Sequence, residues 1–156
     1  MTWGSPPKFI PTKPKQGKII TPEQLAKSGS EDGEQMALFA WAALNCGQYP
    51  MLKWLYSVPN GGSRHIVEAT KMVATGLRKG VPDICLPCVI ENYIKAYNGL
   101  YIELKIEKRR KEKNGGCSEE QIEWIDYLQQ AGYYVKVCYG WEEARDTIIN
   151  YLEGKL

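Results

Sequence analysis

The chain lacks the sequence features that mark membrane-spanning, secreted and disulfide-stabilised proteins. No stretch approaches the roughly 18 to 20 continuous apolar residues that a membrane span needs, and the N-terminal residues lack the apolar core of a signal peptide. Histidine occurs once, and the five cysteines are an odd number whose spacings suggest no disulfide framework. Cys85 and Cys88 resemble half of a zinc site, but no second pair with this spacing completes it. We therefore expect a cytoplasmic protein with reduced thiols and no membrane partner.

The chain does contain enough apolar material for one folded domain, together with an uneven distribution of charge. Its 156 residues and 44% hydrophobic content fit a single domain with a buried core. The net charge is only +2, but residues 1–20 carry four lysines and no acid, and residues 105–113 carry six basic side chains against two acidic ones. Such runs are often solvated surface, but a polarised field also allows a basic face to meet phosphates.

Proline content and apolar spacing divide the chain into an arm and a domain. Five of the nine prolines lie in residues 1–29, which predicts an extended basic arm, followed by a single domain over residues 30–156. Helical periodicity is found over residues 30–45, 64–75, 118–131 and 141–152, and strand-like runs over residues 53–58, 84–86, 100–106 and 133–139. Residues 87–98 have no clear assignment, and residues 107–117 are expected to form an exposed loop. The order predicts an α/β fold with a small mixed sheet flanked by helices.

Two of these helices carry recognisable starts. Ser30 can cap the helix over residues 30–45, whose helical spacing is carried by Met36, Phe39, Ala40, Ala43 and Leu44. Ser118 and Gln121 match a capping box at the start of the helix over residues 118–131.

Charged side chains interrupt the clearest predicted strand, residues 100–106. Because side chains alternate across a strand, Glu103 and Lys105 share one face and Leu104 points to the other. A surface strand with a salt bridge would explain this pair. Asp83, however, opens a second apolar strand directly after Pro82. If the two strands are neighbours, the carboxylates of Asp83 and Glu103 converge, and a hard divalent cation between them would relieve their repulsion.

This arrangement predicts chemistry on a phosphodiester. Mg²⁺ suits one or two carboxylates together with waters and phosphate oxygens. Lys105 would then orient the attacking water or stabilise charge that builds on the phosphate. Acidic residues and lysines are abundant, however, so the spacing of Asp83, Glu103 and Lys105 is a weak pattern by itself.

Several short motifs add to this pattern. Gly80-Val81-Pro82-Asp83, followed by Gly99 to Lys105, resembles the PD-(D/E)xK nuclease signature, and the chain is similar more narrowly to the VRR-NUC family. The same likeness includes the turn at residues 59–62, the approach at residues 76–83, the helix start at residues 118–124 and the closing segment at residues 140–144. It covers nearly everything after Gly29 and implies a restriction-endonuclease-like fold.

The resemblance implies a role for individual residues. Asp83, Glu103 and the backbone carbonyl of Leu104 would bind the metal, and Lys105 would be the catalytic lysine. Gln121 looks like the family's glutamine near the active site, and it can also serve the capping box. Glu34 looks like the family's additional acidic residue that binds metal; the alternative explanation is an acid that suits the helix dipole.

The expected DNA contacts are Asn60, Arg64, Lys108, Arg109 and Arg110; turn chemistry is the alternative explanation for Asn60.

The resemblance also implies an activity and a setting. We expect a Mg²⁺- or Mn²⁺-dependent endonuclease without a small-molecule cofactor, specific for branched DNA such as Holliday junctions, acting as a homodimer in the cytoplasm of a bacterial or phage-infected cell. A dimer face could use Trp54, Tyr56, Tyr93, Tyr97 and Tyr101, which would equally suit a core. The alternatives are a non-specific or restriction-type nicking nuclease and a catalytically inactive DNA-binding module.

Overall fold

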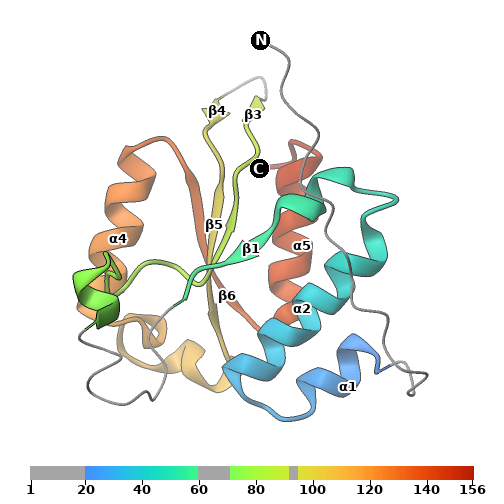
Figure 1. Cartoon of the computed structure of the whole chain (residues 1–156), viewed down its shortest axis with the longest axis horizontal. Coiled ribbons are helices and arrows are strands. Elements are labelled where there is room, and N and C mark those ends of the chain that lie inside the picture. Colours follow the sequence, from blue (N-terminus) through green and yellow to red (C-terminus); the bar gives the residue numbers. More distant parts are fainter. Residues whose placement is uncertain (1–19, 60–70, 92–94) are drawn as a thin grey trace.

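The structure, a computed structural model, describes residues 20–59, 71–91 and 95–156. Its centre is a four-stranded sheet with the order β1-β2-β5-β6 (Figure 1). The strands are β1 (Tyr56–Ser57), β2 (Ile84–Leu86), β3 (Ile90–Glu91), β4 (Ala96–Tyr97), β5 (Leu100–Lys105) and β6 (Tyr134–Tyr139). The helices are α1 (Pro22–Ala26), α2 (Glu31–Asn45), α4 (Glu119–Gln130) and α5 (Trp141–Leu152), with 3₁₀ helices η1 (Pro50–Trp54), η2 (Glu107–Lys111) and η3 (Lys113–Gly116).

The strand that carries the charged pair is an inner strand of this sheet. β5 pairs in antiparallel fashion with β2 and in parallel fashion with β6. The register sets Ile84 opposite Ile102, so Asp83, directly before the first residue of β2, lies beside Glu103. This confirms that the two strands are neighbours. The alternative of a surface strand with one solvated face is wrong, because β5 is buried on both faces apart from the half-buried Tyr101.

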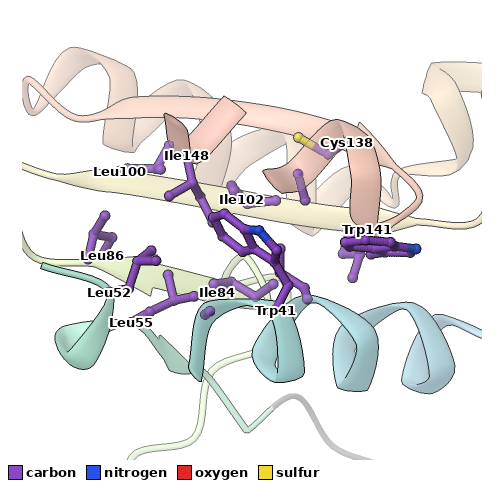
Figure 2. Close-up of a cluster of buried hydrophobic side chains, with 14 of the residues drawn as sticks. Trp41, Leu52, Leu55, Ile84, Leu86, Leu100, Ile102, Cys138, Trp141 and Ile148 are labelled. Atoms are coloured by element: carbon purple, nitrogen blue, oxygen red, sulfur yellow. The ribbon is translucent and has the colours of Figure 1, made fainter. Parts of the chain in front are cut away.

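The hydrophobic core lies between one face of the sheet and the helices α2 and α5, while α4 lies on the opposite side (Figure 1). Side chains from α2, α5 and the sheet meet there, as Figure 2 shows for Trp41, Ile148 and Ile102. Leu100, Ile102 and Leu104 of β5 all belong to this core. The alternation along β5 therefore sends its aliphatic residues into the core and Glu103 and Lys105 to the side of α4.

The bounds of α2 agree with the sequence, but its buried face differs from the expected one. Ser30 caps the helix, because its Oγ accepts a hydrogen bond of 3.1 Å from Gly33 N–H. Met36 and Leu44, however, are 53% and 71% exposed. The core side of the helix is formed instead by Ala37, Leu38, Trp41 and Ala42. The helix has two apolar stripes, and periodicity alone does not distinguish the one that faces the sheet.

The connecting segments hold the other departures from the sequence-based expectation. Residues 50–54, which overlap the strand expected over residues 53–58, form η1, and only Tyr56–Ser57 pair as a strand. The unassigned residues 87–98 contain the antiparallel pair of β3 and β4. The loop over residues 107–117 folds as η2 and η3 and ends in the buried Gly116 and Cys117.

The N-terminal part of the described chain is helical where an extended arm is expected. Pro22–Ala26 form α1, and Thr21 caps it through a capping box with Gln24. Residues 1–19 lie outside the described part, as does most of the helix expected over residues 64–75. Residues 71–74 are helical, and Gly76 ends them with a φ of 107°. Among the described residues, no helix combines the length and apolar character that crossing a membrane requires.

Candidate active site

Asp83 is fastened to β5 through the backbone of Leu104. Its Oδ2 accepts a hydrogen bond of 2.9 Å from Leu104 N–H, which lies beyond the residues of β5 that pair with β2. The aspartate thus takes the place that a strand partner would fill. The N–H and C=O groups of one strand residue point to the same side, so the Leu104 carbonyl also points toward Asp83.

Glu103 is fully buried beside this group. Its Oε1 lies 2.6 Å from Lys105 Nζ and accepts a hydrogen bond of 2.5 Å from Gln121 Nε2. Its Oε2 is buried without a hydrogen-bond donor among the described residues. Burial first, and the nearby charge of Asp83 second, raise the pKa of Glu103 to about 8. A proton shared with Asp83, or a cation beside it, would give Oε2 a partner.

Lys105 is a buried cation, only 4% exposed, that reaches the cleft. Burial acts to lower the pKa of its ammonium group, but the contact with Glu103 outweighs this effect and the pKa is raised above its ordinary value. The charges of Glu31 and Asp83 act in the same upward direction. Lys105 therefore keeps its positive charge at neutral pH, next to the carboxylates.

Gln121 joins the start of α4 to Glu103. Its Oε1 accepts a hydrogen bond of 2.9 Å from the backbone N–H of Ser118, and its backbone N–H donates to Ser118 Oγ at 3.2 Å. These two bonds are the capping box that the sequence predicts. The Nε2 group remains for Glu103, so one side chain serves both the helix cap and the site.

These side chains border an open cleft with a volume of about 880 Å³. One wall comes from α2, with Glu31, Asp32 and Gln35, and another from η2, η3 and the start of α4. The lining also includes Asp83, Leu104, Lys105 and Gln121, as well as Cys117, which belongs to no sequence motif that indicates a site. The cleft is thus wide enough for an extended ligand that meets the acids and the lysine together.

Glu34 does not line this cleft. Its Oε2 accepts a hydrogen bond of 2.8 Å from Trp141 N–H at the start of α5, where Gly140 offers no side chain to cap the helix. The acids of α2 that line the cleft are Glu31 and its neighbour Asp32. All three acids lie in the first turn of α2, so the sequence offers no spacing that separates Glu34 from the other two.

The expected DNA contacts have different surroundings. Arg109 lines the cleft and is paired with Glu112 and Glu31. Arg110 contacts Glu107 and Glu143 at 2.8 Å each and lies 4.3 Å from the ring centre of Tyr139.

Lys108 is exposed at the edge of a smaller hollow beside Arg109. Asn60 and Arg64 fall outside the described residues.

The donor set suits a divalent cation that retains part of its water shell. Within residues 20–59, 71–91 and 95–156, no cluster of three or more His, Cys, Asp or Glu side chains is close enough to hold a metal without other ligands. Asp83, Glu103 and the Leu104 carbonyl supply only oxygen, and none of the described residues donates a hydrogen bond to the buried Oε2 of Glu103. Mg²⁺ accepts such a partial oxygen set and completes it with water or phosphate, so the residues fit this ion.

Comparison with known proteins agrees with this geometry. Residues 22–142, well over half of the chain, match the family described as the VRR-NUC domain. A solved structure titled "VRR_NUC domain protein" has a similar fold, with a TM-score of 0.61 and 24% identity over 79% of this chain and 88% of that chain. No curated protein matches. Because the family match covers most of the chain, including Asp83, Glu103, Lys105 and Gln121, the chain belongs to the VRR-NUC domain family of nucleases.

Proposed function

We propose that this nuclease is a metal-dependent DNA endonuclease whose reaction takes place at Asp83, Glu103 and Lys105. The observation that carries the proposal is the buried Oε2 of Glu103, which has no hydrogen-bond partner in the described part of the chain and lies beside a second carboxylate. A fold does not bury such an oxygen without a cost of about 1–3 kcal/mol. A cation that binds both carboxylates would remove this cost and connect the site to a phosphate.

Asp83, Glu103 and the Leu104 carbonyl would hold Mg²⁺ or Mn²⁺. When bound, such a cation supplies Lewis-acid polarisation of a phosphate oxygen. The protein's own contribution is to fix the ligands: the backbone N–H of Leu104 holds Asp83, and Gln121 holds Glu103. Side chains fixed in this way need little reorganisation when the substrate arrives.

Lys105 would act on the phosphate itself. Its ammonium group has three donors, and the contact with Glu103 Oε1 uses one of them. The remaining donors can orient the attacking water or stabilise the negative charge that develops on the phosphate oxygens. Gln121 holds Glu103 through its Nε2 group, and we propose it as a positioning residue.

The preferred substrate is proposed to be branched DNA, cut by a homodimer. One active site per chain cuts one strand, so paired cuts on a four-way junction would require two copies. Trp54 and Tyr56 are 41% and 47% exposed, and aromatic side chains of this kind are enriched at protein interfaces. Tyr97 and Tyr101 are half-buried against other tyrosines, and Tyr93 lies outside the described residues. A bacterial or phage-infected cytoplasm is the proposed setting.

A cleavage assay with several DNA forms tests the proposal. The chain is incubated with a labelled four-way junction, plain duplex or single strand, in Mg²⁺, Mn²⁺ or EDTA. We expect cleavage only with a metal, and preferentially of the junction. Equal cutting of duplex and junction would indicate a general nicking nuclease, and no cutting of any substrate would indicate a DNA-binding module.

Matched variants connect the activity to the site. Asp83→Asn and Lys105→Ala should each abolish cleavage while the circular dichroism spectrum stays unchanged. Asp126→Asn and Lys111→Ala remove the same charges at exposed positions outside the cleft lining and should keep the activity. Full activity of the Asp83 or Lys105 variant would overturn the proposed site.

A further inference from the structure

Arg109 occupies a prepared position at the mouth of the cleft. Its Nε lies 3.0 Å from Glu112 Oε2, and its Nη1 lies 3.5 Å from Glu31 Oε1. Gly116, with a φ of +78°, packs against the arginine side chain: a Cβ at Gly116 would lie 2.9 Å from Arg109 Cβ and 3.0 Å from its Nε. Any larger residue would push the guanidinium out of this position.

The pair of Arg109 with Glu112 is close, but its pair with Glu31 is loose. A separation of 3.5 Å allows charge attraction but is too long for a good hydrogen bond. Glu31 Oε1 is accordingly buried with no hydrogen-bond partner among the described residues. The carboxylate also acts on Lys105 from across the cleft. Glu31 thus interacts with both Lys105 and Arg109, which line the cleft, without a strong bond to Arg109.

We propose that Arg109 is a phosphate-binding residue whose availability is controlled by Glu31, so that a divalent cation and DNA bind to the cleft cooperatively. This inference rests on the proposed function. A guanidinium offers several donors in a plane that matches phosphate oxygens, and the loosely paired Nη1 is the one that can be released.

The coupling follows from the charges that surround Arg109. Without a cation, a phosphate entering the cleft meets the carboxylates of Glu31, Glu112 and Asp83, and Glu31 offsets the charge of Arg109. With a divalent cation in the cleft, the Glu31 carboxylate would turn toward that charge and release Arg109. Arg109 would then contribute its own charge to the phosphate. Coupling of this kind is reciprocal, so DNA should also raise the affinity for the cation.

Binding measurements test this coupling without relying on catalysis. Fluorescence anisotropy with a labelled four-way junction gives the DNA affinity in EDTA and in Ca²⁺ at several salt concentrations, with the DNA checked for integrity on a gel. In Ca²⁺, Arg109→Ala should weaken binding by about tenfold, the loss expected for one charge-assisted hydrogen bond. It should also reduce the salt slope by about one unit. In EDTA, both effects should be small.

Charge-matched variants separate the control of Arg109 by Glu31 from a general effect of negative charge on DNA binding. Glu31→Gln should raise the affinity in EDTA by releasing Arg109, and this gain should vanish in the double variant with Arg109→Ala. Asp32→Asn removes the same charge from the neighbouring residue, which also lines the cleft but is not paired with Arg109. Its effect should be smaller and should persist without Arg109. Lys111→Ala should act equally in EDTA and Ca²⁺.

Two results would overturn the inference. One is an equal loss for Arg109→Ala in EDTA and Ca²⁺, and the other is an equal gain for Glu31→Gln and Asp32→Asn. Thermal unfolding of each variant excludes a misfolded protein. Arg109→Lys keeps the positive charge and should therefore retain part of the DNA affinity. If the wild-type chain binds no DNA in either buffer, the proposed function fails, and this inference fails with it.

Discussion

Replacing Gln121 with glutamate would separate the two contacts that this side chain makes. A glutamate at this position of the capping box can still accept the hydrogen bond from Ser118 N–H, so the start of α4 is preserved. The second oxygen of the new carboxylate, however, would face Glu103 Oε1, where Nε2 now donates across 2.5 Å. The substitution therefore turns a donor into an acceptor against a buried carboxylate.

The expected cost follows from that contact. Loss of a hydrogen bond to a charged group costs about 1.5–3 kcal/mol, and the repulsion between two carboxylates adds to this when both are ionised. The free energy of unfolding from urea titrations in EDTA should fall by at least this amount at pH 8.5. At pH 5.5 the fall should be smaller, because one proton shared between the two oxygens restores a hydrogen bond.

Ser118→Ala provides the matched control, because it removes the other half of the capping box and leaves the contact between Gln121 and Glu103 in place. It should cost about 0.5–2 kcal/mol at both pH values, as other N-cap losses do. In cleavage assays, Gln121→Glu should lower kcat far more than Ser118→Ala. Equal stability of Gln121→Glu and wild type at pH 8.5, with kcat unchanged, would refute the positioning role.

Two further predictions concern other acids. Because the pKa of Glu103 in the folded, metal-free chain is raised from 4.5 to about 8, the folded state holds its proton more tightly than the unfolded state. Stability in EDTA should therefore decline as the pH rises from about 4.5 to about 8, and the rise in Tm produced by Mg²⁺ should grow over the same range. The decline should be present in the wild type and absent from Glu103→Gln. An identical pH profile in both proteins would contradict the assignment to Glu103. Glu34→Ala should lower the free energy of unfolding by about 0.5–2 kcal/mol, because the cap of α5 is lost, and should leave the Mg²⁺-dependent rise in Tm intact. Loss of the Mg²⁺-dependent rise would indicate instead that Glu34 binds the metal.

The parts of the site that the sequence predicts correctly rest on strict local rules. Alternation along β5 determines that Glu103 and Lys105 share a face, and the capping box determines where Gln121 stands at the start of α4. The approach of Asp83 required a further assumption, that β2 and β5 are neighbours, and the register confirms it.

What the sequence could not provide depends on contacts between distant segments. Glu31 and Glu34 both suit the first turn of α2, and only the packing of α5 against that helix decides that Glu34 caps Trp141 and Glu31 faces the cleft. The outward stripe with Met36 and Leu44 has the same helical spacing as the buried one, so the side that meets the sheet is a tertiary choice. The ion pairs of Arg109 likewise join η2 to α2, which lie far apart in sequence.

The position of β5 inside the sheet has a consequence for the motions of the molecule. Its backbone pairs with β6 along its whole length and with β2 over residues 100–102, Leu104 N–H is bonded to Asp83, and its faces are covered, so its amide hydrogens should exchange with solvent slowly. Glu103 and Lys105 should therefore belong to a slow-opening part of the protein, whereas η2 and η3 at the rim have few buried residues and should open more readily. The groups proposed to react would then stay in place while the rim of the cleft adjusts to an incoming DNA strand.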